Sequence, residues 1–301
     1  MNRASRLIVL VVIALSASLN TVAQKDGDDV IKVDSSIVLV NATVMDAAGK
    51  TVPGLKQKQF TVLEDGVEQQ IATFAAESTP FAAVILIDTS GSMEERVSMA
   101  RSAAIRFLEG LRPEDFAAIY HFDSQVKQVQ DFSNSRDITE SIFDLKADGM
   151  TVLNDAVYRA AALLSNRPEK RRAIIVLSDG ADNQSRRSQD AALKAAIAAN
   201  ATIYTIDMSS PDENGPGRSQ SQGALKSFAQ RSGGTFVATP GGAAMRLAFK
   251  EIVEELGSQY TISYEPKNTK ADGKFRSIEI KISLPALTIR TRKGYNAPKS
   301  K

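Results

Sequence analysis

Apolar residues follow three patterns along this chain, and each pattern predicts a different kind of structure. From Val30 to about Thr79, short β-branched runs such as 37–44 and 60–63 alternate with turn residues. After Gly257 the alternation returns, most clearly at 277–283. Between these two β zones, continuous apolar runs alternate with alanine-rich stretches of helical spacing.

The middle zone predicts an α/β domain with a mostly parallel sheet. Its continuous apolar runs are typical of strands that are covered on both faces. The predicted strands are 84–87, 116–120, 173–177 and 202–206, and the predicted helices are 93–110, 153–165, 189–200, 223–231 and 243–256. Strands that alternate with helices in this way form a doubly wound sheet with helices on both faces. The loop between Ser209 and Gln222, rich in Pro and Gly, is predicted to be the most mobile segment.

The two terminal β zones are expected to form one domain together. Neither has enough strands to be stable alone, so we expect them to pair into a small β-sandwich-like domain with the α/β domain inserted. The predicted boundaries are 24–79 for the N-terminal β segment, 80–257 for the α/β domain and 258–301 for the C-terminal β segment.

The first residues have the order of a secretory signal. Arg3 and Arg6 precede the apolar run 7–15, and small residues at 21–23 favour cleavage before Gln24. An uncleaved anchor is the alternative, but the run is shorter than the roughly 20 residues needed to span a membrane. We therefore expect a signal peptide at 1–23 and an exported protein, periplasmic or secreted, with no membrane span after cleavage.

Composition excludes several kinds of function. The 301 residues include 37 Lys and Arg against 35 Asp and Glu, a net charge of +2 that falls to about zero without the two arginines of the signal. That balance argues against nucleic acid as a partner. The absence of cysteine excludes disulfides, zinc–thiolate sites and a cysteine nucleophile, and one histidine cannot form a histidine cluster.

Oxygen-bearing side chains gather where predicted strands end, which is where doubly wound sheets bind ligands. Asp88, Ser90 and Ser92 follow the strand 84–87, Asp179 follows the strand 173–177, and Thr151 precedes a helix. Each element alone is most simply a helix cap or a turn. Together they supply two carboxylates and three hydroxyls, a donor set that suits a hard divalent cation such as Mg²⁺.

These residues resemble a known motif. The series Asp88-x-Ser90-x-Ser92, Thr151 and Asp179-Gly180 is similar to the metal-ion-dependent adhesion site of von Willebrand factor type A domains, and the resemblance covers about 80–257. The flanking segments 52–66 and 264–295 resemble those of the VWFA-related family known from Acidobacteria.

The resemblance implies a Rossmann-like domain that binds acidic groups of other proteins through a metal, usually Mg²⁺, with Mn²⁺ or Ca²⁺ as alternatives. By position, Ser90 and Ser92 would be direct ligands, Thr151 a conformationally switched ligand, and Asp88 and Asp179 would act mainly through water. The partner would be a protein with an exposed Asp or Glu. Met150 departs from the family pattern, which more often has glycine there, without removing a ligand.

Two other functions stay open from the sequence. One is a scaffold or assembly factor whose metal site is structural or vestigial. The other is a metal-dependent hydrolase, which would need a general base beyond the carboxylates already assigned as ligands. His121 follows a buried strand without the nucleophile elbow of a serine hydrolase, so we interpret it as a satisfied strand-end residue. We expect the protein not to be an enzyme.

Overall fold

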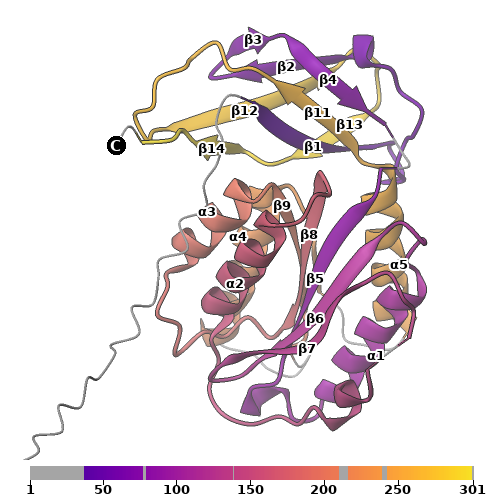
Figure 1. The fold of residues 1–301 in the computed structure, drawn as a ribbon, viewed down its shortest axis with the longest axis vertical. Coiled ribbons are helices and arrows are strands. Elements are labelled where there is room, and N and C mark those ends of the chain that lie inside the picture. The colour runs from indigo at the N-terminus through magenta and orange to yellow at the C-terminus, as the bar shows by residue number, and fades with distance from the viewer. Residues whose placement is uncertain (1–36, 77–78, 138, 210–215, 239–242, 300–301) are drawn as a thin grey trace, which may run out of the picture. The chain divides into compact units, whose positions relative to one another are not determined.

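The computed structural model describes residues 37–76, 79–137, 139–209, 216–238 and 243–299 (Figure 1). The predicted signal peptide, 1–23, lies outside these ranges. The described residues form a six-stranded mixed sheet and two four-stranded sheets. Within them, no helix has both the length and the apolar character needed to cross a membrane.

The six-stranded sheet has the order β10-β9-β8-β5-β6-β7, parallel except for β7. Its strands are β5 (Phe81–Asp88), β6 (Phe116–Phe122), β7 (Val126–Ser133), β8 (Arg171–Ser178), β9 (Ala201–Asp207) and β10 (Phe236–Ala238). Every residue of β5 is buried, because one parallel strand pairs with it on each side, β6 and β8, and helices cover both faces of the sheet.

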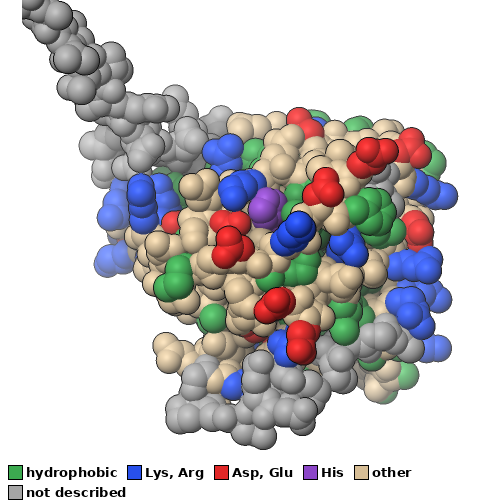
Figure 2. Space-filling view, turned by 90° about the horizontal axis from the view of Figure 1, so that it is seen from below, with side chains coloured by type: hydrophobic (Ala, Val, Ile, Leu, Met, Phe, Trp, Pro, Cys, Tyr) green, Lys and Arg blue, Asp and Glu red, His purple; other side chains and the backbone are tan. Residues whose placement is uncertain are grey.

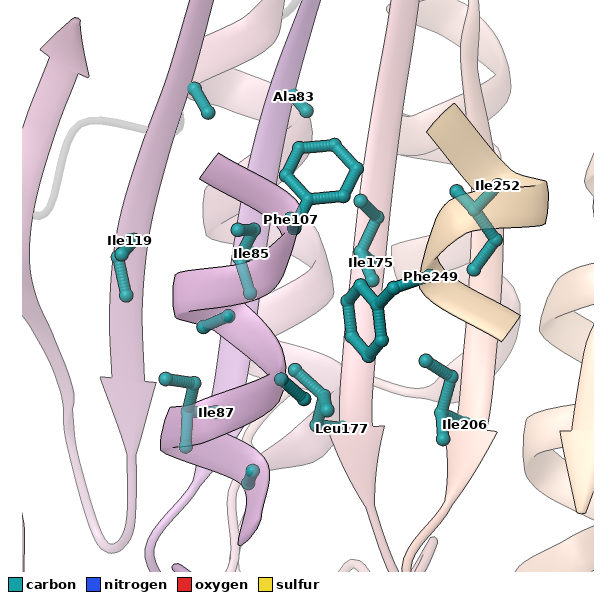
Figure 3. Close-up of a cluster of buried hydrophobic side chains, with 14 of the residues drawn as sticks. Ala83, Ile85, Ile87, Phe107, Ile119, Ile175, Leu177, Ile206, Phe249 and Ile252 are labelled. Carbon is teal, nitrogen blue, oxygen red and sulfur yellow. The ribbon is translucent and has the colours of Figure 1, made fainter. Parts of the chain in front are cut away.

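Alternate residues of β5 enter two separate cores. Ile85 and Ile87 pack among residues of α1 and α5, including Phe107 and Phe249, whose ring centroids are 6.2 Å apart (Figure 3). Val84 and its alternate neighbours pack against α2, α3 and α4. The helices are α1 (Val97–Glu109), α2 (Leu153–Ser165), α3 (Gln189–Ala198), α4 (Pro216–Ser232) and α5 (Ala243–Ser258), with short 3₁₀ turns at Gln57–Gln59, Gly91–Met93 and Glu140–Asp144.

Three local predictions differ from the structure. The helix predicted at 93–110 begins only at Val97, after the 3₁₀ turn Gly91–Met93. α4 begins at Pro216, so the last part of the loop predicted at 209–222 is helical, while 210–215 lies outside the described residues. Proline fits the first turn of a helix, which needs no donor from its nitrogen. The edge strands β7 and β10 were not predicted, because they lack a continuous apolar run.

The terminal segments pair into a sandwich, which confirms the predicted fold class. One sheet has the order β13-β1-β11-β4 and the other β14-β12-β2-β3, so each combines strands from both ends of the chain. The strands are β1 (Val38–Met45), β2 (Phe60–Glu64), β3 (Val67–Gln69), β4 (Ile71–Ala75), β11 (Tyr260–Tyr264), β12 (Phe275–Ile282), β13 (Thr288–Thr291) and β14 (Gly294–Asn296). Their inward residues, such as Val40, Val62 and Ile262, share one core.

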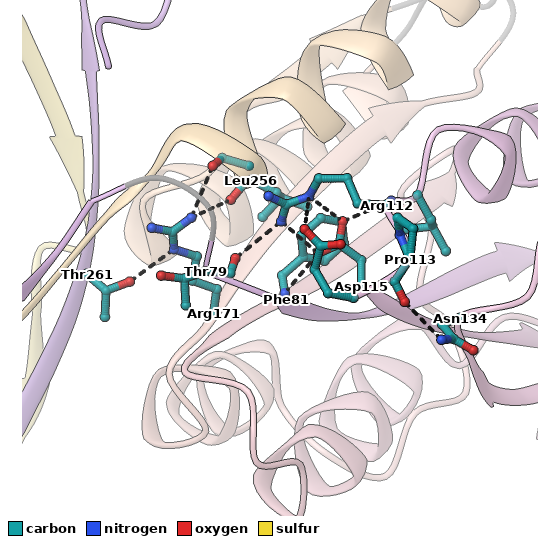
Figure 4. A network of polar contacts seen from close by, with 12 residues as sticks. Thr79, Phe81, Arg112, Pro113, Asp115, Asn134, Arg171, Leu256 and Thr261 are labelled. Atoms are coloured by element: carbon teal, nitrogen blue, oxygen red, sulfur yellow. Dashed lines mark hydrogen bonds and ion pairs between the residues drawn. The ribbon is translucent and has the colours of Figure 1, made fainter. Parts of the chain in front are cut away.

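Arg171, the first residue of β8, links the α/β domain to the sandwich (Figure 4). The side chain is fully buried. Its Nε donates to Thr261 Oγ1 at 3.1 Å, Nη1 donates to the carbonyls of Leu256 and Gly257, and Nη2 donates to the carbonyl of Ala76 at 2.7 Å. One guanidinium therefore ties the end of α5 and both crossings between the domains to the start of a central strand.

Glu255, on α5, makes a second link. Its Oε1 accepts hydrogen bonds from Thr43 Oγ1 at 3.0 Å and Tyr204 Oη at 2.7 Å, and its carboxylate pairs with Arg290. Thr43 and Arg290 belong to the sandwich, whereas Tyr204 belongs to β9. Burial is the main reason that the pKa of Tyr204 lies well above its ordinary value. Its hydroxyl therefore stays protonated and donates to the carboxylate.

We expect Arg171→Leu to lower the free energy of unfolding by about 2–4 kcal/mol, because three carbonyls and a hydroxyl would lose a charged donor inside the protein. Chemical denaturation of the full chain measures this. The matched control is Arg106→Leu on the exposed face of α1, which should change stability by no more than about 0.5 kcal/mol. Equal effects of the two substitutions would show that Arg171 does not hold the junction.

Candidate metal site

Three loops meet at the carboxyl end of the parallel strands, and backbone hydrogen bonds join them. In the loop after β5, Gly91 N donates to Gly149 O at 3.1 Å, and Thr89 O accepts from Asp148 N at 2.8 Å. The loop before α2 is joined in turn to the loop after β8, since Thr151 N donates to Asn183 Oδ1 at 2.9 Å. The structure therefore brings together the three segments on which the predicted ligands lie.

The carboxylate of Asp88 lies at the centre of the predicted set. Oδ1 accepts from both the backbone N and the Oγ of Ser90, at 2.9 and 2.6 Å. Oδ2 accepts from Ser178 Oγ at 2.5 Å. The Oγ atoms of Ser90 and Ser92 are 3.2 Å apart. Asp88, Ser90 and Ser92 thus form one connected group of oxygen atoms.

The environment of Asp88 disfavours a negative charge. Its side chain is fully buried, and this burial raises the pKa of Asp88 to about 7, with a further contribution from the charge of Asp179. Hydrogen bonds from Ser178 and Ser90 offset only part of the cost. These hydrogen bonds come from hydroxyls and a backbone amide, which carry no net positive charge. A cation beside the carboxylate would reduce the remaining cost of burying its negative charge.

The other predicted ligands lie on the same three loops. Thr151 is buried and lies two residues before the start of α2, and Asp179 is nearly buried directly after β8. Asp179 Oδ1 accepts from Ala181 N at 3.0 Å, which fixes this turn. Ser92 is exposed, so the group opens to solvent on its side.

The donor chemistry fits a hard divalent cation. All five predicted side chains present oxygen, and Mg²⁺ is held in proteins by one or two carboxylates while it keeps several waters. Among the described residues, no three His, Cys, Asp or Glu side chains come together as a metal site. The predicted set contains only two carboxylates, Asp88 and Asp179, and its other donors are hydroxyls. A cation here would depend on those hydroxyls and on water.

Two residues of the site were not assigned from the sequence. Ser178 holds Asp88 Oδ2, and Asn183 holds the backbone of Thr151. Ser178 could have been found from register, because Ile87 and Leu177 are partners on β5 and β8, so the next residues, Asp88 and Ser178, lie side by side. Asn183 gives no such signal, since it lies in an irregular loop.

Two glycines shape the metal loops. Gly149 has φ +76°, and a Cβ there would lie 2.8 Å from Ser124 Oγ. Gly180 has φ +84°, and a Cβ there would collide with the backbone carbonyl of Ser221 on α4. Met150, by contrast, is half exposed at 47%, and its backbone N donates to Ser124 Oγ. The methionine therefore leaves the loop backbone in place.

The histidine is part of the packing around the site. His121 Nδ1 lies 2.9 Å from Thr89 Oγ1, and partial burial lowers the pKa of its imidazole. Ser90, the residue that a hydrolase would use, is hydrogen-bonded to Asp88. In the face shown in Figure 2, acidic and basic side chains are interspersed around the histidine, unlike the one-sign surface that nucleic acids need.

Comparison with known proteins relates the α/β domain to a known family. Residues 83–181 match the family model of the von Willebrand factor type A domain. Inter-alpha-trypsin inhibitor heavy chain H3 of Bos taurus is 29% identical over an alignment of 118 residues, which covers 35% of this chain and only 13% of that protein. Residues 83–181 are therefore similar in sequence to von Willebrand factor type A domains.

One solved structure supports the fold, and a second is reported beside it. A conserved hypothetical protein, BatB from Bacteroides thetaiotaomicron, is 17% identical and superposes with a TM-score of 0.50 over 59% of this chain and 100% of its own. A von Willebrand factor type A protein from Catenulispora acidiphila is 15% identical, with a TM-score of 0.48, and matches 89% of this chain and 74% of its own.

The raised pKa of Asp88 predicts how the metal-free protein responds to pH. From an unfolded pKa near 3.8 up to about 7, the folded state binds more protons, so stability falls as pH rises. Asp88→Asn removes this ionisation. We expect the variant and the chelator-treated parent to be similar near pH 4, and the variant to be more stable by about 2–4 kcal/mol at pH 8.

Urea denaturation at several pH values measures the difference. Asp131→Asn, at an exposed carboxylate on β7, is the control and should track the parent at every pH. Parallel stability curves for Asp88→Asn and the parent would contradict the account of Asp88.

Proposed function

We propose that this protein binds another protein through a divalent cation, Mg²⁺ by preference, held at the carboxyl end of the sheet. Ser90, Ser92 and Thr151 would supply hydroxyl ligands, and Asp88 and Asp179 would act mainly through bound water. The observation that supports this most is the fully buried carboxylate of Asp88, surrounded by hydroxyls on loops that are hydrogen-bonded to one another.

This donor set favours capture of a carboxylate. Hydroxyl ligands donate little charge, so a divalent cation bound here keeps part of its positive charge and an affinity for a further anionic oxygen. An Asp or Glu of the partner is the natural source of that oxygen. The exposed side of Ser92 gives the direction from which a partner would reach the site.

We propose a binding role and not a catalytic one. The hydroxyl of Ser90 donates to Asp88, a residue of the proposed ligand set. The hydroxyl beside the chain's one histidine belongs to Thr89, which is fully buried and donates to the carbonyl of Phe122, so a substrate could not reach it. The carboxylates that might serve as a general base belong to the proposed ligand set. A scaffold with a purely structural metal is the alternative, and partner binding that does not depend on metal would favour it.

We further propose that the protein is exported. Support comes from the order of basic, apolar and small residues at 1–23, which is that of a cleaved secretory signal. Export would place the site outside the cytoplasm, where it meets partners of other cells or of the same envelope. N-terminal sequencing of the protein recovered outside the cytoplasm tests this, and a chain that begins at Gln24 is the expected result.

Calorimetric titration of the chelator-treated chain with Mg²⁺ tests the metal. We expect saturable binding to one site and a melting temperature that rises with metal concentration, as linkage requires. Asp88→Ala should abolish both effects, and Asp131→Ala, at an exposed carboxylate elsewhere on the sheet, should change neither. Equal binding by the parent and Asp88→Ala would place the cation elsewhere.

Thr151 tests whether the metal serves partner binding. Thr151→Val removes the hydroxyl and keeps the shape, whereas Thr151→Ser keeps the hydroxyl. Captured proteins from the exported fraction are compared by mass spectrometry for the three forms, with Mg²⁺ and with chelator. We expect the same partner with the parent and Thr151→Ser, at least tenfold less with Thr151→Val, and none with chelator. Capture that survives chelation would contradict the proposal.

A further inference from the structure

The C-terminal segment crosses between the two sheets of the sandwich, so that only part of β12 has a strand partner on its outer side (Figure 1). Residues Thr288–Thr291 form β13 at the edge of one sheet, and Gly294–Asn296 form β14 in the other. β14 pairs with β12 only from Phe275 to Ser277. Among the described strands, the rest of β12 therefore pairs on one side only, with β2.

The backbone of β12 shows which groups face the uncovered side. Ser283 N donates to Gln59 O, next to β2, whereas Ile278 N points the other way and donates to Lys293 O at 3.0 Å. Successive residues of an antiparallel strand alternate in direction. The backbone N–H and C=O of Ile280 therefore face away from β2, toward β13.

A groove follows this edge. Its volume is about 390 Å³, within the range of about 300–1,000 Å³ that is usual for ligand clefts. Ile278, Ile280 and Ile289 line it with apolar surface and also belong to the sandwich core or pack against it. Gln230, in the last turn of α4, and Gly234, just after α4, line the other side. An incoming strand would therefore meet the backbone N–H and C=O of Ile280 and the apolar side chains that line the groove.

The charges around the groove favour an acidic occupant. Arg290, Arg292 and Lys293 line it, against one acid, Glu279. Arg290 is paired with Glu255, and Glu279 lies 3.7 Å from Lys281, so Arg292 and Lys293 are the cations that an occupant would meet. Arg292 is nine-tenths buried, and its Nη1 donates to the carbonyl of Ile197 and to Asn200 Oδ1. Its Nε has no hydrogen-bond partner among the described residues. Burial lowers the pKa of Arg292 to about 10, so this cation is held at a cost that a nearby anion would reduce.

We propose that this groove binds an extended, acidic segment of a partner protein, which pairs with the free edge of β12 beyond Ile278 and lies in line with β14. Such strand addition takes affinity from main-chain hydrogen bonds and specificity from alternate side chains. Apolar side chains of the segment would enter the groove beside Ile280, and its acidic ones would lie toward Lys293.

This surface is distinct from the metal site. The sandwich contacts the start of β8 through Arg171 and Thr261, whereas Asp179 and the metal loops follow the strand's other end. Strand addition should therefore persist in chelator. This separates a failure of the present proposal from a failure of the metal-dependent one.

The experiment titrates the full chain, in chelator, with a short capped peptide of alternating valine and aspartate, and follows residue-resolved amide exchange by NMR. We expect saturable binding and exchange of the Ile280 amide that is at least tenfold slower, with no change at Ile262 in the centre of the other sheet. A valine–lysine peptide should bind at least fivefold more weakly. Lys293→Glu should weaken the acidic peptide by a similar factor, and Lys267→Glu, on an exposed turn away from the groove, should not.

Three outcomes would overturn the proposal. One is the absence of binding at millimolar peptide. Another is binding that leaves the Ile280 amide unprotected, which would place the peptide on a different surface. The third is protection of Ile280 that rises with protein concentration and without peptide, because it would assign the edge to contact between two copies of this chain.

Discussion

The structure depends on one costly arrangement, a carboxylate buried at the end of a strand that is itself wholly buried. β5 lies at the centre of the sheet with helices on both faces, so Asp88 leaves the apolar core with little access to water. Ser90 and Ser178 supply hydrogen bonds, yet the pKa of Asp88 stays near 7. Structural carboxylates of folded proteins usually have lowered pKa values, and raised ones gather at functional sites. The proposed cation would offset the free-energy cost of burying the charged carboxylate of Asp88.

The sandwich is joined to the opposite end of the same sheet. Arg171 begins β8 and binds the segments that pass between the domains, while Glu255 joins α5 to both domains. Two crossings and two buried polar links make a rigid connection more favourable than a flexible one.

Much of the fold could be predicted from the sequence because its strongest signals are local. The apolar spacing of α2 gave its bounds, Leu153 to Ser165, and continuous apolar runs located the central strands. β7 escaped prediction because its residues are mostly polar and half exposed, and its pairing contains irregularities. In the same way, α4 begins with a polar stretch that has no apolar period, so the sequence predicted only its later part, 223–231.

The candidate site was only partly accessible from the sequence, for a physical reason. Asp88, Ser90, Ser92, Thr151 and Asp179 lie at predicted strand ends or helix starts, so spacing alone suggested that they meet. The role of Ser178 needs the register of β8 against β5, and that of Asn183 needs the path of an irregular loop. The raised pKa of Asp88 is a property of burial, which no local pattern reports.

The most direct test of the central claim is a crystal structure of the mature chain grown with Mn²⁺, with anomalous scattering used to locate the metal. The account predicts one strong anomalous peak about 2.0–2.2 Å from the Oγ atoms of Ser90 and Ser92, with Asp88 within reach through water. A well-ordered site without a peak there, or a metal bound only by other residues, would contradict it.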